Sequence, residues 1–403
     1  MKDKIIMVCY ACEPGGATEH GLGWQWVLRT SQFKDVILIT RPGRKGLAEE
    51  CNKNGIELVE VEVPSIRRKL TQPFGDVGIW IRIYSWASNV NKHIKKIVDK
   101  ETIEYVHLVT FHSIWMPNIF KGVETKKIWG PVSGGEYVPS AYMEYVGPEN
   151  KKEKIRNRIN RWMTKRLVNK AKSCDLMICG NSQTLALAND SGCSKTALIL
   201  PNAVSKIPKQ KARKSYSEGE CLNFAFVGSC QGRRTLTLLM SALAKANDIK
   251  WKLDIAGTGP ALRFWKQYAK DLLISDNIEF HGWVGKDVVD MIYQRAHIFA
   301  FTTIRDGGGS GMLEALERGV PVLALDWGGP ADVIADTGAG KLITADSPET
   351  SIAEIKSWVV GLAEGKINYS EMVEKAENFN FEDYWWETKL QKYLDIANAI
   401  KKS

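Results

Sequence analysis

The chain has 403 residues, and its 55 Lys and Arg against 46 Asp and Glu give a formal charge of +9. With 44% hydrophobic and 25% charged residues, the composition is that of an ordinary globular protein, which excludes a mainly disordered, collagen-like or coiled-coil chain. The positive excess lies in the first half: residues 1–200 hold 30 basic and 20 acidic residues, and residues 201–403 hold 25 and 26.

Apolar runs along the chain are short. None approaches the roughly 18 residues that span a bilayer, and the run over 5–9 is too short for a secretory leader, so we expect a cytoplasmic protein. Cys9 and Cys12 form a Cys-x-x-Cys pair. A redox role would need thioredoxin-like surroundings, and a zinc site would need a second pair. Cys174 and Cys179, spaced five apart, make a poor one.

Short β-branched runs alternate with longer stretches of helical period. Strands are predicted over 5–9, 36–40, 57–61, 105–109, 126–130 and 175–179, and a helix over 80–100. The pattern restarts, with further strands over 223–228, 251–257, 277–282, 297–302 and 321–326. Such alternation is typical of a parallel sheet covered by helices, so the sequence predicts two α/β units in series.

The boundary between these units is visible as a change in composition. Residues 205–220 are rich in Lys and almost free of apolar residues, which predicts a solvated linker. We therefore expect an N-terminal domain over 1–204 and a second domain over 221–375. The remaining segment, 376–403, is predicted to be helical. It begins with aromatic residues that need a packing partner, which the first domain could provide.

Residues 151–172 hold ten Lys and Arg and one Glu. By helical spacing Arg158, Trp162, Arg166 and Lys170 share a face, and an apolar stripe runs through Ile155, Ile159, Met163 and Leu167. A solvated surface helix explains this pattern. A contact with anionic membrane headgroups or with a phosphate-bearing acceptor also explains it. Nucleic acid is the weaker alternative, because no recognised nucleic-acid-binding module accompanies the segment.

Glycine-rich turns follow several of the predicted strands. Gly15 and Gly16 follow the first strand, and the strand ending at Gly228 leads to Arg233 and Arg234. Arginine can offer two parallel donors to phosphate oxygens, so the second turn suits a diphosphate. Gly257 and Gly259 follow the next strand. The alternatives are turns that only require a positive φ, and ordinary surface charge.

The most informative segment runs from 300 to 330. Asp306 precedes three glycines and Ser310, and a predicted helix beginning near Met312 carries Glu314. Backbone N–H groups before a helix favour an anion. Carboxylates beside such a site are better explained as acceptors for the hydroxyls of a sugar or ribose than as phosphate ligands. The alternative is a helix-capping acid and a surface Glu.

Taken together, these motifs resemble the family 4 glycosyltransferases of GT-B fold. The resemblance covers about 221–345, including the turn Gly257-Thr258-Gly259-Pro260 and the stretch Asn277–Val284. Asp306 and Glu314 keep the spacing of the family's two acids, with Asp in place of the first Glu. Gly328-Gly329 and Asp332 fit its later motif. The first half matches more loosely, over 13–24 and 129–135.

The resemblance implies two Rossmann-like domains facing across a cleft, with the C-terminal helix crossing back to the first. It also implies retaining transfer of a sugar from a nucleotide-diphosphate sugar to a hydroxyl acceptor, in polysaccharide or glycolipid assembly. No metal ion or other cofactor is expected, since arginines can neutralise the diphosphate and the chain has no Asp-x-Asp. The alternatives are a nucleotide-sugar epimerase of the same fold and a non-catalytic binding or scaffold partner.

The resemblance also implies residue roles. Glu314 would hold the ribose, and Arg233 and Arg234 the leaving diphosphate. Asp306 and the amides of Gly308, Gly309 and Ser310 would hold the transferred sugar and the diphosphate. The donor-binding set further includes Gly15, Gly16, Gly228, Gly257, Gly259, Trp283 and Val284, and the acceptor-side candidates are Glu19, His107 and His112. Two departures are that Ser229 stands where the family has an Arg and that 129–135 lacks the family's His.

Overall fold

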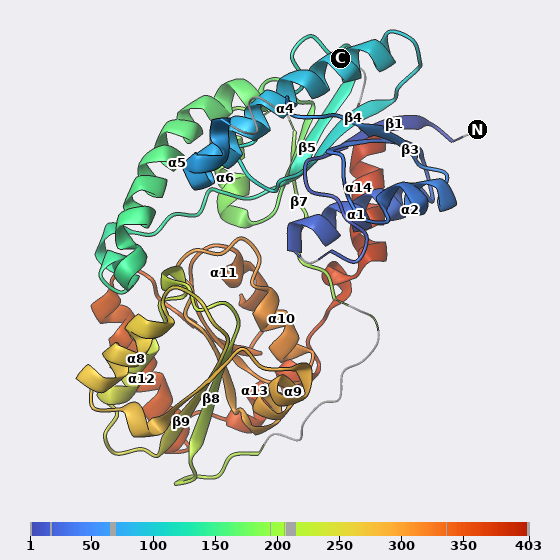
Figure 1. The fold of residues 1–403 in the computed structure, drawn as a ribbon. Helices are drawn as coiled ribbons and strands as arrows, with labels where there is room; N and C mark the ends of the chain where they lie inside the picture. The colour runs from blue at the N-terminus through green and yellow to red at the C-terminus, as the bar shows by residue number, and fades with distance from the viewer. Residues whose placement is uncertain are drawn as a thin grey trace. The chain divides into compact units, whose positions relative to one another are not determined.

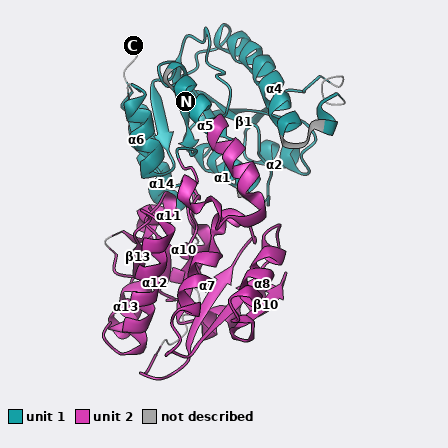
Figure 2. Ribbon diagram, turned by 90° about the vertical axis from the view of Figure 1, so that its left-hand side faces the viewer, with its two compact units in different colours: residues 1–135, 160–201, 386–403 teal, residues 136–159, 202–385 magenta. Residues whose placement is uncertain are grey.

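The computed structural model describes residues 2–16, 18–64, 70–193, 195–204, 206, 215–335 and 337–400. Two compact units divide the chain (Figure 2). The first comprises residues 1–135, 160–201 and 386–403, and the second comprises 136–159 and 202–385. Residues 205 and 207–214 of the predicted linker lie outside the described residues.

The first unit is built on a parallel sheet whose strands, among the described residues, are ordered β3-β2-β1-β4-β5-β6-β7. The strands are β1 (Lys4–Cys9), β2 (Asp35–Thr40), β3 (Glu57–Glu60), β4 (Tyr105–Thr110), β5 (Lys126–Val132), β6 (Leu176–Cys179) and β7 (Thr196–Leu198). Its helices are α1 (Thr18–Thr30), α2 (Leu47–Lys53), α4 (Gly75–Val98), α6 (Ser182–Asp190) and α14 (Trp386–Asn398), with the 3-10 turn η1 (Gln72–Phe74). Helix α5 (Asn150–Ala171) runs from the second unit into the first.

Helices cover both faces of this sheet, which explains its continuous apolar strands. Ile6 and Val8 of β1 cluster with Trp86 of α4 on one face. On the other face, α14 lies beside α1 (Figure 1), and Trp386 packs edge-on against Trp26 with 5.4 Å between ring centroids. Of the segment 376–403, which was predicted to be helical, α14 packs in the first unit, whereas residues 376–385 group with the second.

The second unit has a parallel sheet of order β10-β9-β8-β11-β12-β13 among the described residues. Its strands are β8 (Leu222–Val227), β9 (Trp251–Ala256), β10 (Ile278–Gly282), β11 (Ile298–Phe301), β12 (Val322–Leu325) and β13 (Gly340–Ile343). Its helices are α7 (Leu236–Ala244), α8 (Leu262–Asp271), α9 (Lys286–Arg295), α10 (Ser310–Leu316), α11 (Gly329–Ile334), α12 (Pro348–Ala363) and α13 (Tyr369–Glu377). The 3-10 turns are η2 (Ser140–Met143), η3 (Gly147–Glu149), η4 (Gly232–Arg234), η5 (Ser275–Asn277) and η6 (Glu382–Tyr384).

The predicted α/β class with two parallel sheets is confirmed. Strands β7 and β13, of three and four residues, were not predicted. Residues 136–159 group with the second unit, whereas the sequence suggested one domain over 1–204. Their packing explains the difference: Tyr142 is fully buried and shares a hydrogen bond of 2.8 Å with Ser351 of α12.

Strand order reverses once in each sheet, between β1 and β4 in the first unit and between β8 and β11 in the second. The connections leave such a point toward opposite sides, so a crevice opens beyond the carboxyl ends of the two strands. The loops after β1, β4, β8 and β11 are therefore where a ligand is expected. No helix among the described residues is long and apolar enough to cross a membrane.

His107 of β4 belongs to the core of the first unit. Its ring is fully buried and stacks on Tyr393 of α14 at 5.0 Å, and its Nε2 lies 2.7 Å from the carbonyl oxygen of Gly130. Burial disfavours the charged ring and lowers the pKa of His107 to about 4. An unfolded chain would present the same ring with a pKa of about 6.5.

This difference predicts a pH-dependent stability. Between pH 6.5 and 4, His107 binds a proton in the unfolded state but not in the folded state. The free energy of unfolding therefore falls as pH falls, by about 3 kcal/mol at most. Urea unfolding followed by far-UV circular dichroism across this range should show the loss. His107→Gln, which does not titrate, should lack this component, and His93→Gln on α4 should keep it. The same slope in His107→Gln as in the parent chain would contradict the prediction.

Candidate functional site

The loop after β8 forms the η4 turn and carries Arg233 and Arg234. Backbone bonds tie this turn to the end of β11: the amide of Ile304 donates to the carbonyl of Arg233 at 3.0 Å, and the hydroxyl of Thr235 donates to the carbonyl of Thr302. Both guanidinium groups are thereby held at the point where strand order reverses. Arg233 and Arg234, the predicted diphosphate-binding pair, therefore lie where ligands commonly bind in open parallel sheets.

The loop after β11 brings Asp306 to the same place. Its Oδ2 accepts hydrogen bonds from Nη1 of Arg233 at 3.1 Å and from Nη1 of Arg234 at 2.7 Å. Its Oδ1 accepts from the amides of Gly308 and Gly309, both at 2.9 Å. Four of the predicted donor-site groups are thus assembled around one carboxylate.

Charge and burial reinforce each other in this cluster. Burial acts to raise the pKa of Asp306, but the two arginines and the two glycine amides outweigh it and hold the pKa below its usual range. Burial, with Arg234 acting in the same direction, lowers the pKa of Arg233 to about 10. Asp306 and Arg233 are therefore charged at neutral pH, and the two guanidinium groups beside one carboxylate give the site an excess of positive charge.

The glycines at the turns of β8 and β9 have a structural reason to be glycine. Gly257 has a φ of +140°, and a Cβ built there would lie 1.8 Å from the carbonyl oxygen of Gly228. A Cβ at Gly259 would likewise lie 2.4 Å from the carbonyl oxygen of Cys230. Close packing of the two turns thus accounts for Gly257 and Gly259 without any ligand. Their predicted donor contacts stay predictions.

Residues 136–159 support the site in a way that the sequence did not reveal. The carboxylate of Glu149 accepts from the amide of Gly232 at the start of η4. Glu153 is buried and forms a two-pronged pair with Arg305, with bonds of 2.9 and 2.7 Å. The signal was present, because Glu153 is the one acid among ten bases in 151–172.

The remaining candidates of the second unit lie on its surface. Glu314 and Ser310 are exposed on α10. Trp283 is 82% exposed in the turn between β10 and α9, and Val284 beside it is half-buried. An exposed indole of this kind has room to stack on a nucleotide base.

In the first unit the structure brings Glu19 and His112 together. They follow β1 and β4, and a carboxylate oxygen of Glu19 lies 3.3 Å from both the amide nitrogen and Nδ1 of His112. Nε2 of His112 is buried without a hydrogen-bond partner among the described residues. Gly15 is exposed with a φ of +68°, and the amide of Gly16 donates to the carbonyl of Glu13 at 3.1 Å. His107, the third acceptor-side candidate, lies instead in the core under Tyr393, which corrects the expectation that it faces an acceptor.

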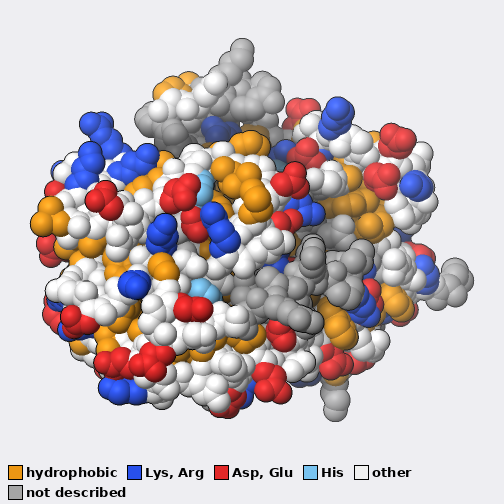
Figure 3. Space-filling model, turned by 90° about the horizontal axis from the view of Figure 1, so that it is seen from below, with side chains coloured by type: hydrophobic (Ala, Val, Ile, Leu, Met, Phe, Trp, Pro, Cys, Tyr) orange, Lys and Arg blue, Asp and Glu red, His pale blue; other side chains and the backbone are white. Residues whose placement is uncertain are grey.

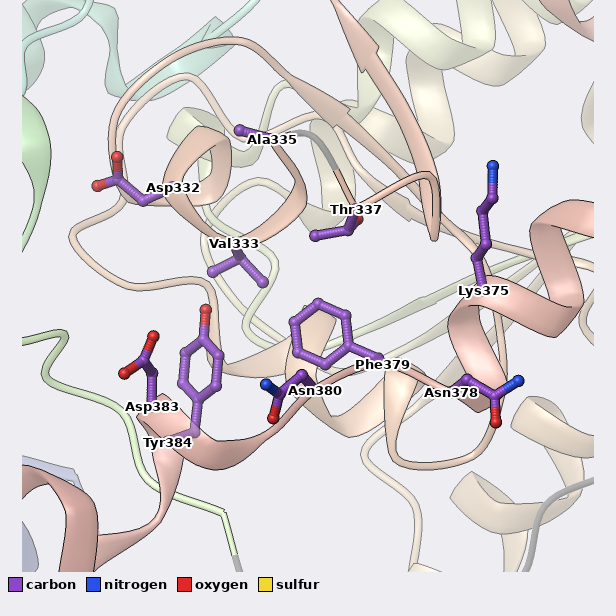
Figure 4. Close-up of a pocket in the computed structure, with 10 residues that line it drawn as sticks. All are labelled: Asp332, Val333, Ala335, Thr337, Lys375, Asn378, Phe379, Asn380, Asp383 and Tyr384. Carbon is purple, nitrogen blue, oxygen red and sulfur yellow. The ribbon is translucent and has the colours of Figure 1, made fainter.

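A separate cavity of about 420 Å³ lies in the second unit (Figure 4). The ring of Phe379 stands at the centre of its labelled side chains, with Asp332 and Asp383 to one side and Lys375 to the other. Asp332 matches the late acid of the family motif. Because none of the predicted site residues lines this cavity, we place the candidate site at the loops after β8 and β11 instead.

Comparison with known proteins finds a family match for most of the second unit. Residues 208–379 match the family model described as Glycosyl transferases group 1, and this range contains η4 and the loop after β11. Over 190 residues the chain is 25% identical to the lipopolysaccharide 1,6-galactosyltransferase of Escherichia coli K12. That alignment covers 46% of this chain, which spans about half, 52%, of the length of the relative.

Solved structures extend the likeness of fold to the whole chain. The apo form of the lipopolysaccharide outer core galactosyltransferase WaaB superposes with a TM-score of 0.63 at 14% identity, covering 97% of this chain and 98% of the other. HepE of Anabaena, solved in complex with UDP, gives a TM-score of 0.61 at 12% identity, covering 98% and 100%. The fold is like that of the GT-B glycosyltransferases, and residues 208–379 match the model of the group 1 glycosyl transferases.

Proposed function

We propose that this protein transfers a sugar from a nucleotide-diphosphate sugar to a hydroxyl acceptor, with retention of configuration and without a metal ion. The observation that carries the proposal is the convergence of Arg233 and Arg234 at the strand-order reversal of the second unit. The family match over the same residues supports it. The galactosyltransferase relative supports a saccharide or glycolipid acceptor.

The proposed reaction mainly requires positively charged side chains held at fixed positions. The bond from the anomeric carbon to the phosphate oxygen breaks, a bond to the acceptor oxygen forms on the same face, and the acceptor proton passes to the leaving diphosphate. Negative charge grows on that diphosphate, and the two fixed guanidinium groups stabilise it. Because Arg233 and Arg234 are held before the donor arrives, little reorganisation is needed.

The other proposed roles follow the positions of the side chains. Glu314 would accept from the ribose hydroxyls, and Trp283 and Val284 would face the base. The amides of Gly308, Gly309 and Ser310 would lie along the transferred group. Glu19 and His112 would serve as acceptor-side residues of the first unit, and Gly15 and Gly16 as donor-binding residues of that unit. His112 is the stronger candidate there, because its buried Nε2 is free to bind a sugar hydroxyl.

A panel of nucleotide sugars, beginning with UDP-glucose and UDP-galactose, tests the proposal by calorimetry and by product release. We expect one donor to bind and to be turned over in the presence of EDTA when a hydroxyl acceptor is supplied. Glu314→Ala should weaken donor binding about tenfold or more, since it removes hydrogen bonds to a charged acceptor. Glu364→Ala, an exposed acid of the same unit, is the matched control.

Each alternative has its own outcome. Conversion of the donor without any acceptor would indicate an epimerase, and binding without turnover would indicate a non-catalytic partner. Failure to bind any nucleotide sugar would overturn the proposal. Unchanged donor affinity in Glu314→Ala would remove the ribose role alone.

We also propose that α5 docks on an anionic membrane surface, which would place the protein at a cytoplasmic membrane face beside a lipid-linked acceptor. The predicted apolar stripe is divided in the structure: Met163 and Leu167 are buried, whereas Ile155, Ile159 and Trp162 are 56%, 38% and 50% exposed. Exposed cations surround these three side chains, at Lys151, Lys154, Arg158, Arg161, Lys165 and Arg166.

Aliphatic and indole side chains among cations are what a headgroup region accommodates. Lys170, predicted on the same face, instead turns inward and donates to the carbonyls of Ile114 and Met116. On the face at the bottom of Figure 1, acidic and basic side chains are interspersed (Figure 3).

Vesicle flotation tests this docking. Changing Lys154, Arg158 and Arg161 to Gln should lower binding to phosphatidylglycerol-containing vesicles by about 100-fold, at about 1 kcal/mol per cation. The triple change Lys245→Gln, Lys250→Gln and Lys252→Gln removes the same charge from exposed sites of the second unit and should have little effect. Equal loss in both triples, or no binding of the parent chain, would contradict the proposal. Donor binding should be unaffected in both.

A further inference from the structure

The carboxylate of Asp306 is fully engaged before any ligand is present. A carboxylate has about four lone-pair positions, and this one accepts four hydrogen bonds, two on each oxygen. The side chain is only 16% exposed. A sugar hydroxyl could bind to it only by displacing a guanidinium group or a glycine amide.

We infer that Asp306 is a positioning residue, which holds Arg233 and Arg234 side by side as a binding site for a diphosphate and does not itself contact the transferred sugar. This inference rests on the proposed function and changes the role that the family resemblance implied for Asp306. Its basis is the shared oxygen Oδ2, to which both arginines donate.

Two guanidinium groups this close repel each other, and burial strengthens that repulsion. The other hydrogen-bond partners of the pair among the described residues are neutral: Arg233 donates to the carbonyl of Arg305 and to Gln231, and Arg234 to Thr303. Asp306 is the anion that the two share. Without Asp306, this repulsion would tend to move the two guanidinium groups apart.

The neighbouring arginine does not compete for this carboxylate. Arg305 is paired with the buried Glu153 at 2.7 Å, so its charge is balanced separately. Among the described residues, the hydrogen bonds of the pair use Nε and Nη1 of Arg233 and Nη1 of Arg234, which leaves the Nη2 groups to donate to a ligand. A diphosphate arriving at the pair can therefore be bound without breaking the arrangement that Asp306 maintains.

Substitution of Asp306 by Asn separates the two tasks of this side chain. The amide oxygen of the new side chain could still accept from the glycine amides, but an NH2 group would face the arginines where Oδ2 had been. If Asp306 merely competed with the anion, removing its charge would strengthen diphosphate binding. If Asp306 positions the arginines, the same change weakens binding. The two possibilities predict opposite signs.

The experiment is calorimetric titration of the full chain with inorganic pyrophosphate, with UDP and with the nucleotide sugar that the donor panel selects. Asp306→Asn should weaken pyrophosphate and UDP binding about tenfold or more, as expected when charge-assisted bonds lose their geometry. Asp306→Glu, which keeps the charge, should recover part of the loss. Asp276→Asn, at an exposed position in η5, is the matched control.

The possible failures are distinguishable. If Asp306→Asn binds pyrophosphate as tightly as the parent chain or more tightly, the positioning role is wrong while the proposed function stands. If the loss is confined to the nucleotide sugar and spares UDP and pyrophosphate, Asp306 contacts the sugar and the inference is wrong. If the parent chain binds no diphosphate, the proposed function itself fails. Should Asp306→Asn not fold, Asp306→Ser, whose hydroxyl can also accept from the amides, carries the same expectations.

Discussion

Reversal of strand order is the constraint on which the candidate site depends. Between β8 and β11 the chain connections leave in opposite directions, so the loops that follow these strands meet with no helix between them. Residues 73 positions apart in sequence, Arg233 and Asp306, therefore come within hydrogen-bonding distance. The same reversal between β1 and β4 brings Glu19 to His112. In each unit, the reversal of strand order therefore also brings the candidate residues together.

The exposed charges of α5 and the largely buried charges of the second unit have different roles. The excess of the first half is carried by the exposed side of α5, where cations remain in water and act at long range. In the second unit the total is near zero, yet three largely buried charges and a Glu153–Arg305 pair lie at the candidate site. Low dielectric makes these few charges count for more than the many on the surface.

Local patterns predicted local structure well. Alternating apolar runs predicted the sheets, and a glycine-rich turn predicted that Arg233 and Arg234 follow a strand, because both patterns depend on neighbours in sequence. Packing partners far along the chain could not be predicted in this way. The residues next to His107 in sequence do not predict that Tyr393 packs on it, and those next to Glu153 do not predict its ion pair with Arg305. The engagement of Asp306 by both arginines likewise depends on a partner on another strand, which no single motif specifies.

The position of α14 in the chain has a consequence for biosynthesis. Residues 202–385 of the second unit leave the ribosome before α14 does, so Trp26 and His107 lack their cover of Trp386 and Tyr393 while that unit is being made. Domains commonly complete folding in the order of their synthesis. Here that order is reversed, because the first unit, whose synthesis begins first, cannot complete its fold until α14 has been made. A nascent chain halted before residue 386 would hold a complete second unit beside an open first one.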